Sequence, residues 1–189
     1  MATRSLTGKF LVGITGHYKN TLTSAGESGE INTIEFGDRY AENFTGGTAA
    51  NQANRVWESR GRTLTSGNTE DIDVYDFGSL NIGGGAGKDV HGGAIALTSI
   101  KAFYIKNHSD SAGTVVFGGK GASTAWDSFF GATAGNVYDS KLNVAPGACV
   151  AYINPGANGL TVTDSTNHLL TIAASGGDVE YDILIIGEE

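Results

Sequence analysis

The sequence predicts a single all-β domain built as a sandwich or a barrel, and two properties of the chain favour this fold class. The composition disfavours long helices, because 29 of the 189 residues are glycine, only two are proline, and Thr, Ser and Asn are plentiful. Apolar runs of roughly four to eight residues also recur about every ten residues, each cut by Gly, Asn or Pro. Short strands at this spacing are typical of sandwiches and barrels.

The clearest strand signal lies at residues 179–186. In its first half, apolar Val179 and Tyr181 alternate with acidic Glu180 and Asp182, and its second half is apolar on both sides. Glycines bound this stretch, which is too short for a globular helix. We therefore expect a strand inside a sheet, half exposed at its start and buried at its end.

The N-terminal part of the chain gives weaker signals. Two strands are predicted over residues 6–14 and 30–36, separated by a polar stretch around residues 21–29. Residues 37–54 have no sustained periodicity and are predicted to form a long ordered loop. Because long loops in compact domains usually carry function, this loop is a candidate site.

The rest of the chain gives a regular series of strands separated by turns. Two glycine-rich segments interrupt the series, one at residues 78–93 and one at residues 118–135. The predicted strands cover residues 55–64, 70–75, 100–107, 114–117, 141–144, 148–153, 160–163 and 168–173, and the strand at 179–186 follows them.

Charge and cysteine content argue against several classes of partner and site. A net charge of −8 disfavours nucleic acid and anionic membranes, which attract clustered Lys and Arg. Cys149 is the only cysteine and lies in an apolar run, so we expect a buried, inert thiol and no internal disulfide. The apolar run at residues 10–12 is too short for a signal peptide, and no segment is long enough to span a membrane.

No cofactor, metal or catalytic motif emerges from the residues. The glycine-rich segment at residues 83–88 lacks the first glycine and the final Ser or Thr of a phosphate-binding loop. The four histidines are too far apart in sequence for zinc spacing. Asp71, Asp73 and Asp76 resemble a calcium loop only superficially, because strand alternation puts Asp71 and Asp73 on a solvated face. We therefore predict no cofactor, no metal and no enzymatic activity.

One basic cluster surrounds Trp57. Strand alternation places Arg55 beside Trp57 on one face and Arg60 with Arg62 on the other, so the cluster forms no continuous patch for a polyanion. Two interpretations remain open. The arginines are either paired charges at a sheet edge or a contact with an acidic partner protein.

The second glycine-rich segment carries three large aromatic residues, Trp126, Phe129 and Phe130. Aromatic side chains of this size are expected to pack down over one end of the sandwich. The alternative is a glycan-binding site, in which an exposed Trp126 ring would act together with Asp127 and Asn136.

Two segments of the sequence resemble small virion proteins of tailed bacteriophages. Residues 47–74, GTAANQANRVWESRGRTLTSGNTEDIDV, resemble a block of the form G-x-x-ANQA-x-x-VW followed by R-T-L and T-E-D-[IL]-D. In the C-terminal half, IKAFYIKN, VVFGG, VAPGACVAYINP, LTVT, HLLTIAASG and VEYDILIIG are similar to the successive strands of that group. The resemblance covers roughly two thirds of the chain. Residues 118–136 depart most from the pattern, and the first forty residues do not match it.

The resemblance implies a jelly-roll or related β-sandwich that sits on the outside of a phage head as a cement or decoration protein. It further implies that the protein forms a homotrimer, binds the major capsid protein and is assembled in the host cytoplasm, without a nucleic acid or membrane partner. Residues 1–30 are expected to form an arm or first strand, and residues 31–189 the sandwich.

The arm and the loop at residues 37–54 are expected to contact the capsid. Two alternatives are a head-fibre or receptor- and glycan-binding module, and a structural β-protein unrelated to phages. The candidate contact residues are Arg39, Tyr40, Phe44, Arg55, Trp57, Arg60, Arg62, Trp126 and Phe129.

Overall fold

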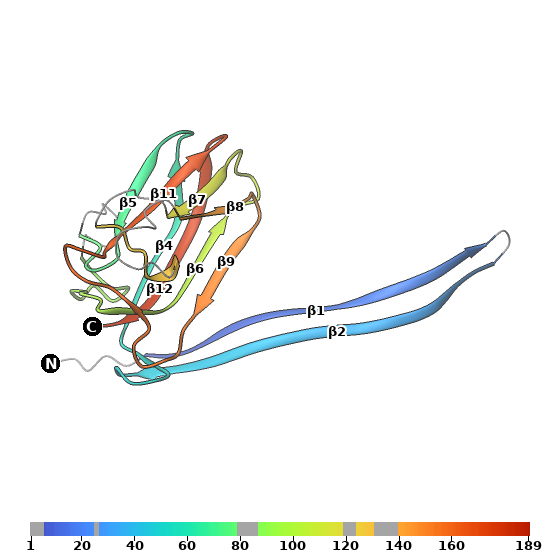
Figure 1. The fold of residues 1–189 in the computed structure, drawn as a ribbon, viewed down its shortest axis with the longest axis horizontal. Coiled ribbons are helices and arrows are strands. Elements are labelled where there is room, and N and C mark those ends of the chain that lie inside the picture. The colour runs from blue at the N-terminus through green and yellow to red at the C-terminus, as the bar shows by residue number, and fades with distance from the viewer. Residues whose placement is uncertain (1–5, 25–26, 79–86, 119–123, 131–139) are drawn as a thin grey trace.

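The computed structural model describes residues 6–24, 27–78, 87–118, 124–130 and 140–189. Within these ranges the regular structure is all β apart from one short 3-10 helix, η1 (Ser128–Phe130), so the predicted fold class is confirmed. Figure 1 shows two parts: a sandwich of two sheets formed by strands β4 to β12, which we call the body, and a long two-stranded hairpin, which we call the arm.

The first sheet of the body is built around the strand with the clearest sequence signal. This strand, β12 (Val179–Glu188), pairs antiparallel with β4 (Arg55–Leu64) on one side and with β6 (Ser99–Asn107) on the other. The far edge of β6 pairs with β9 (Cys149–Ile153) and with the short β10 (Leu160–Thr161). Both edges of β12 are therefore paired, as expected for a strand this apolar.

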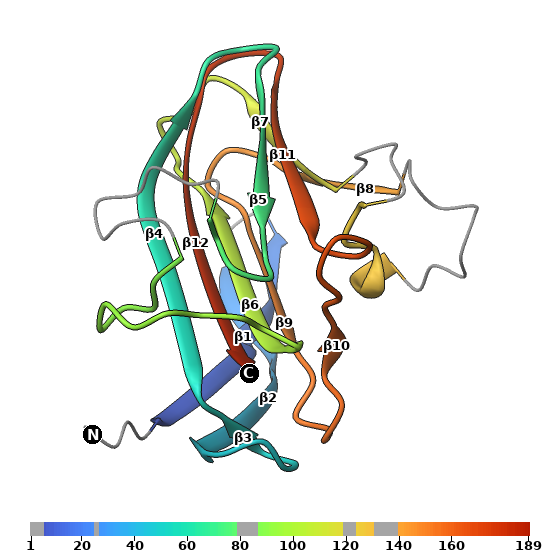
Figure 2. The same ribbon diagram turned by 90° about the vertical axis from the view of Figure 1, so that its left-hand side faces the viewer.

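The second sheet has the order β5-β11-β7-β8 and is antiparallel throughout. Consecutive strands cross between the two layers, because β4 leads to β5, β6 to β7, β8 to β9 and β11 to β12 (Figure 2). These crossings tie the two sheets together at the ends of their strands. The strands of the second sheet are β5 (Thr69–Asp73), β7 (Thr114–Gly118), β8 (Lys141–Val144) and β11 (Leu169–Ser175).

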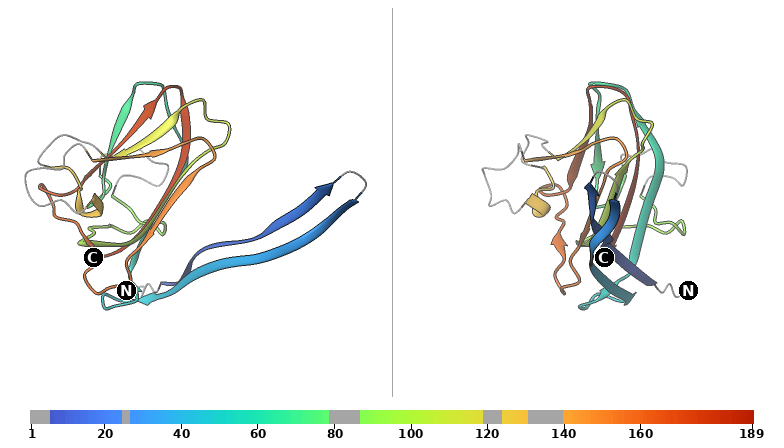
Figure 3. Two further views of the ribbon diagram at one scale, coloured as in Figure 1. Left: turned by 45° about the vertical axis from the view of Figure 1, so that its right-hand side comes forward. Right: turned by 90° about the vertical axis from the view of Figure 1, so that its right-hand side faces the viewer.

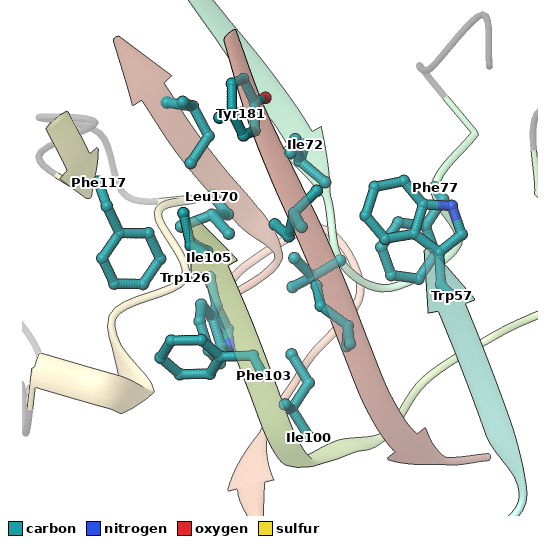
Figure 4. Packing of buried hydrophobic residues seen from close by; sticks show 14 of the residues in the cluster. Trp57, Ile72, Phe77, Ile100, Phe103, Ile105, Phe117, Trp126, Leu170 and Tyr181 are labelled. Carbon is teal, nitrogen blue, oxygen red and sulfur yellow. The ribbon is translucent and has the colours of Figure 1, made fainter. Parts of the chain in front are cut away.

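The main hydrophobic core lies between the two sheets (Figure 4). Phe103 of β6 and Phe117 of β7 come from opposite sheets, and their ring centroids are 5.5 Å apart. Trp57 of β4 stacks on Phe77 with the ring centroids 4.3 Å apart. Because each buried side chain of this size stabilises the fold by about 1.5–3 kcal/mol, this core holds the body together.

Strand alternation explains which side chains of β12 enter the core. Tyr181, Ile183 and Ile185 are buried between the sheets, whereas Asp182 and Leu184 are only partly buried on the outer face. The alternation predicted for the first half of this strand is therefore confirmed, but the expectation of a second half buried on both faces was wrong, because Leu184 and Ile186 remain partly exposed.

A β-bulge in β4 changes the expected orientation of Arg62. Arg60 and Gly61 lie between two paired positions that are separated by a single residue, Asp182, on β12. The backbone φ of Gly61 is +61°, a conformation that favours glycine and is typical of bulges. The extra residue turns Arg62 toward Tyr181, so the prediction that Arg60 and Arg62 share a face was wrong.

The arm is the hairpin of β1 (Thr7–Ser24) and β2 (Glu27–Gly46), with 18 and 20 residues. It leaves the body on the side of the sheet that contains β6 and β9 and extends far beyond it (Figures 1 and 3). The prediction of a loop over residues 37–54 was wrong, because residues 37–46 continue β2. A turn then leads to the short β3 (Gln52–Ala53), which pairs in parallel with the end of β2.

Candidate protein interaction site

The root of the arm packs on the outer face of the β12 sheet as a second, smaller hydrophobic cluster. Phe44 of β2 is only 1% exposed, and it lies in this cluster with Ala53 and with Ala102 of β6. Phe10 of β1 and Ile186 of β12 pack against the same group. The arm is therefore seated on the body by buried apolar surface and not only by the covalent chain.

Backbone hydrogen bonds hold the turn that follows the arm. The Asn51 amide donates to the Pro155 carbonyl at 2.8 Å, and the Asn54 amide donates to the Gly187 carbonyl at 3.0 Å. The turn begins at Gly47, whose φ is +145°, and a Cβ at this position would collide with the Gln52 side chain. These contacts fix the direction in which the arm leaves the body.

A buried ion pair lies at the same end of the body as the root. Lys101 is completely buried, and its Nζ is 3.1 Å from Glu188 Oε2. The same ammonium group donates to the carbonyl oxygens of Gly156, at 2.7 Å, and Ala157. Ser99 Oγ donates to the other carboxylate oxygen of Glu188 at 3.0 Å. The only sequence signal for this pair is a lysine inside the apolar strand predicted at residues 100–107, and no pair was predicted from it.

Beyond its root, the arm exposes large apolar side chains. Leu11 is 52% exposed, Val12 42% and Tyr40 46%. Val12 and Tyr40 lie directly opposite each other in the hairpin register, and strand alternation places Val12 on the same face as Phe10. In the described part of the chain, the body has only Val90 as an exposed large apolar side chain. Apolar side chains gathered on one projecting element are typical of a protein contact surface.

Three predicted contact residues are exposed in the structure. Arg39 and Tyr40 lie on β2 of the arm, and Arg60 lies on the outer face of β4, where it pairs with Glu58. The arm brings Arg39 and Tyr40 close to Leu11 and Val12, which the sequence analysis did not single out. Arg60 is on the body and belongs to a different surface.

Other predicted contact residues lie inside the molecule. Phe44 seats the arm, and Trp57 stacks on Phe77 in the main core, where Trp57 is 4% exposed. Arg55 is partly exposed and forms an ion pair with Glu189. In the isolated chain these side chains therefore make contacts within the body and the root.

The aromatic residues of the second glycine-rich segment pack over the core, as the sequence predicts. Trp126 is 2% exposed, and its indole N–H donates to the Thr161 carbonyl at 3.1 Å. Phe129 is half-buried and lies 5.0 Å from Phe103, ring centroid to centroid. The glycan alternative required an exposed Trp126 ring, which this burial removes, and Asn136 lies outside the described residues.

Arg62 belongs to a partly buried polar network that joins β4, β5 and β12. It forms an ion pair with Glu70, and its Nε donates to the Tyr181 hydroxyl at 3.1 Å. Burial lowers the pKa of Arg62, but the hydrogen bonds to Glu70 and Tyr181 and the charges of these two groups together outweigh burial and leave the pKa raised. Burial, together with the Glu70 carboxylate, also raises the pKa of the Tyr181 phenol far above its usual value. Arg62 therefore links three strands.

The outer face of the β12 sheet carries a hollow with a volume of about 360 Å³. Its lining mixes charges, because Arg60 and Lys106 lie beside Asp182, with Tyr104 and Leu184 between them. Four of its seven lining residues are charged, whereas a typical small-molecule pocket is lined mainly by apolar side chains. Among the residues that the structure describes, no three His, Cys, Asp or Glu side chains lie close enough together to hold a metal ion.

One histidine lies between two carboxylates beside this hollow. His108 Nε2 is 3.0 Å from Asp182 Oδ1, and His108 Nδ1 is 3.4 Å from Glu180 Oε1. Burial raises the pKa of the Asp182 carboxyl, but the Gly61 amide, which donates at 2.9 Å, and His108 together lower it below its usual value. This cluster holds the turn after β6 against β12.

Cys149 differs from its prediction. The sequence predicts a buried thiol, but Cys149 is exposed on β9. Alternation along this strand directs Val150 and Tyr152 toward the main core, so their neighbours face outward. The prediction of a buried thiol was therefore wrong, because this apolar run is covered on only one face of β9.

Comparisons of this chain with protein-family models, with curated proteins and with solved structures found no match. In the ranges that the structure describes, no helix has the length and apolar character needed to cross a membrane. The arm, its root and the outer face of the β12 sheet therefore remain the features on which a functional interpretation rests.

Proposed function

We propose that this chain is a structural virion protein that binds the outside of a phage head and reinforces contacts between capsomers of the major capsid protein. The observation that carries the proposal is the arm, which is seated on the body at Phe44 and exposes Leu11, Val12 and Tyr40 beyond it. The exposed apolar side chains of the arm provide a surface on which a neighbouring protein can pack.

The physical argument starts from the stability of a hairpin. Two strands alone are marginally stable in water, because they have no third strand or covered face to bury apolar side chains. An 18-residue strand also extends about 60 Å, so the arm reaches beyond the footprint of the body. In a closed shell, many weak contacts of this kind add through effective concentration.

The strand order supports a jelly roll as the specific form of the sandwich. Apart from the short β10, strands β4-β12-β6-β9 form one sheet and β5-β11-β7-β8 the other, and each strand pair is antiparallel. Double sheets of eight strands with such crossings are characteristic of viral capsid domains, among others. This order agrees with the fold that the sequence resemblance implies.

Binding of the purified full-length chain to heads tests the proposal. Heads of the virus that encodes the chain, stripped of it, are mixed with the wild type, and the bound fraction is measured by sedimentation. We expect saturable binding and heads that withstand a higher temperature. Val12→Ala combined with Tyr40→Ala removes only exposed arm side chains and should weaken binding by about tenfold.

Val90→Ala provides the matched control, because Val90 is an exposed large apolar side chain on the body and its truncation should leave binding to heads unchanged. The proposal is wrong if native heads do not contain the chain, or if stripped heads fail to bind the wild type.

A further inference from the structure

The two faces of the arm differ in chemistry. In the hairpin register, Phe10 lies opposite Glu42, and Val12 lies opposite Tyr40. Strand alternation puts these side chains on the same face as Phe44, and we call this face the seat face. Its large and charged side chains, from the root outward, are Phe44, Phe10, Glu42, Val12, Tyr40 and Asp38.

The opposite face of the arm is basic over the same stretch. Lys9 and Arg39 lie on this face together with Leu11, and all three side chains are exposed. Both faces therefore expose apolar surface, but the charges beside it are negative on the seat face and positive on the opposite face. A partner that covers one face is distinguished from a partner that covers the other by its charge.

The seat face is already an interface at the root of the arm. There, Phe44 is buried beside Ala102, and Ile186 packs against the same cluster. Beyond the root, the arm projects past the body (Figure 1), and the next apolar pair on the seat face is uncovered. Val12 is 42% exposed and Tyr40 46%. The seat face therefore continues a buried apolar contact as an exposed apolar surface.

Two carboxylates flank this exposed apolar surface. Asp38 is exposed, and the partly exposed Glu42 accepts a hydrogen bond from the Tyr40 hydroxyl at 3.2 Å. Between the root and Asp38, no Lys or Arg shares the seat face with them. Covering these carboxylates costs free energy unless the covering surface supplies positive charge. A Lys or Arg of the partner can also pack on the Tyr40 ring.

We propose that the seat face beyond the root is the docking surface of the arm, and that its occupant is a segment of the major capsid protein in which Lys or Arg flanks apolar side chains. The apolar side chains of this segment pack on Val12 and Tyr40, and its basic side chains pair with Asp38 and Glu42. The opposite face of the arm stays in solvent. This inference rests on the proposed function, which supplies the partner, and adds the face that is covered and the charge that covers it.

Two double variants with the same net charge test the role of the carboxylates in binding to stripped heads. Asp38→Asn with Glu42→Gln removes two of the 20 acidic residues against 12 basic ones, so the net charge changes from −8 to −6. Asp110→Asn with Asp164→Asn makes the same change at exposed positions of the body. The arm variant should bind about threefold more weakly or worse at low salt, and its binding should depend less on NaCl concentration. The body variant should bind as the wild type does.

A third double variant tests which face of the arm is covered. Lys9→Gln with Arg39→Gln removes the charges of the opposite face and should leave binding unchanged or slightly tighter. Weaker binding by this variant would place the partner on the opposite face and overturn the proposal. Equal weakening by the arm and body acidic variants would also overturn it, because the attraction would then depend only on net charge.

Carbodiimide cross-linking on heads that have bound the wild type identifies the occupant, because this reagent joins a carboxylate to an amine in contact with it. Mass spectrometry should find Asp38 or Glu42 joined to a lysine of the major capsid protein. A cross-link of these carboxylates to a second copy of the chain instead would contradict the proposed occupant. A cross-link between Lys9 and a capsid carboxylate would contradict the proposed face.

The failure of this inference can be told apart from the failure of the proposed function. Heads that bind the wild type and the arm acidic variant equally would overturn this inference alone. Heads that do not bind the wild type would overturn both. Circular dichroism should give the same unfolding midpoint for all variants, because the substituted side chains lie outside both hydrophobic clusters.

Discussion

The body and the arm are built from the same element, the antiparallel strand pair, but only the body has an interior. In the body, two sheets enclose Trp57, Phe103 and Phe117. The arm is a single layer whose described side chains are buried only at the root, around Phe44. The body is therefore stabilised by its own packing, whereas the outer arm depends on its root and on whatever it contacts. Substitutions in the two regions should differ accordingly.

The largest difference is expected between a core residue and an arm residue. Phe103→Ala should lower the free energy of unfolding by about 3–5 kcal/mol, because it leaves a cavity between the sheets. Val12→Ala, on the exposed arm, should change it by less than about 0.5 kcal/mol. Urea unfolding followed by circular dichroism measures both. Equal losses would mean that the arm and the body unfold as one unit.

The buried ion pair should have the next largest effect. Lys101→Ala leaves the Glu188 carboxylate buried without its partner and should cost about 3 kcal/mol of folding free energy. Replacing both residues by methionine removes both charges and should recover most of this loss. The same unfolding experiment measures both variants. If the double variant is as unstable as the single one, the pair does not act through its charge.

Substitution at the root should affect the arm more than the body. Phe44→Ala removes the central side chain of the second hydrophobic cluster, so arm amides should exchange with solvent roughly ten times faster or more. Amides of β6 and β12 within the main core should keep their protection. Tyr40→Ala is the control, because Tyr40 is exposed and contributes nothing to the seat. Unchanged arm protection in Phe44→Ala would show that the root cluster does not hold the arm.

The smallest effect on stability is expected from Asp182, which lies with Glu180 around His108 on the outer face of the β12 sheet. The folded-state pKa of Asp182 is lowered, so its contribution to stability is present above about pH 4 and is lost as the pH falls through the folded-state pKa. Asp182→Asn should therefore reduce stability at pH 7 by less than about 1 kcal/mol, because solvent screens this site. Its difference from the wild type should shrink toward pH 3.

Leu184→Ala is the control, because Leu184 lies on the same face as Asp182 and carries no charge. Urea unfolding should show the same loss of stability relative to the wild type at pH 7 and at pH 3. A difference for Asp182→Asn that grows as the pH falls would contradict the assigned sign.

Strands with one covered face could be predicted closely from the sequence. The strands at residues 55–64 and 141–144 have the predicted bounds, because alternation and turn residues mark both ends. The second half of β2 was missed because an arm without an interior imposes no alternation on its residues. The bulge at Gly61 was missed as well, although an isolated glycine inside a strand is a signal for a bulge.

The candidate site was predictable only in part. Arg39 and Tyr40 were selected, and the structure places them on the arm. Trp57 and Trp126 were selected as large aromatic residues, but side chains of this size are mostly buried in folded proteins. Leu11 and Val12 could not be identified, since exposure of an apolar residue depends on the absence of a covering layer, which no local pattern reports.

The hydrophobic cluster at the root of the arm also determines when the arm can dock on the body during synthesis. Phe10 and Phe44 leave the ribosome early, whereas Ile153 and Ile186, on which they pack, are made more than one hundred residues later. The hairpin therefore has no place to dock until the last strand of the sandwich has been translated and paired. A nascent chain therefore cannot hold the arm in its folded orientation before the sandwich that seats it has formed.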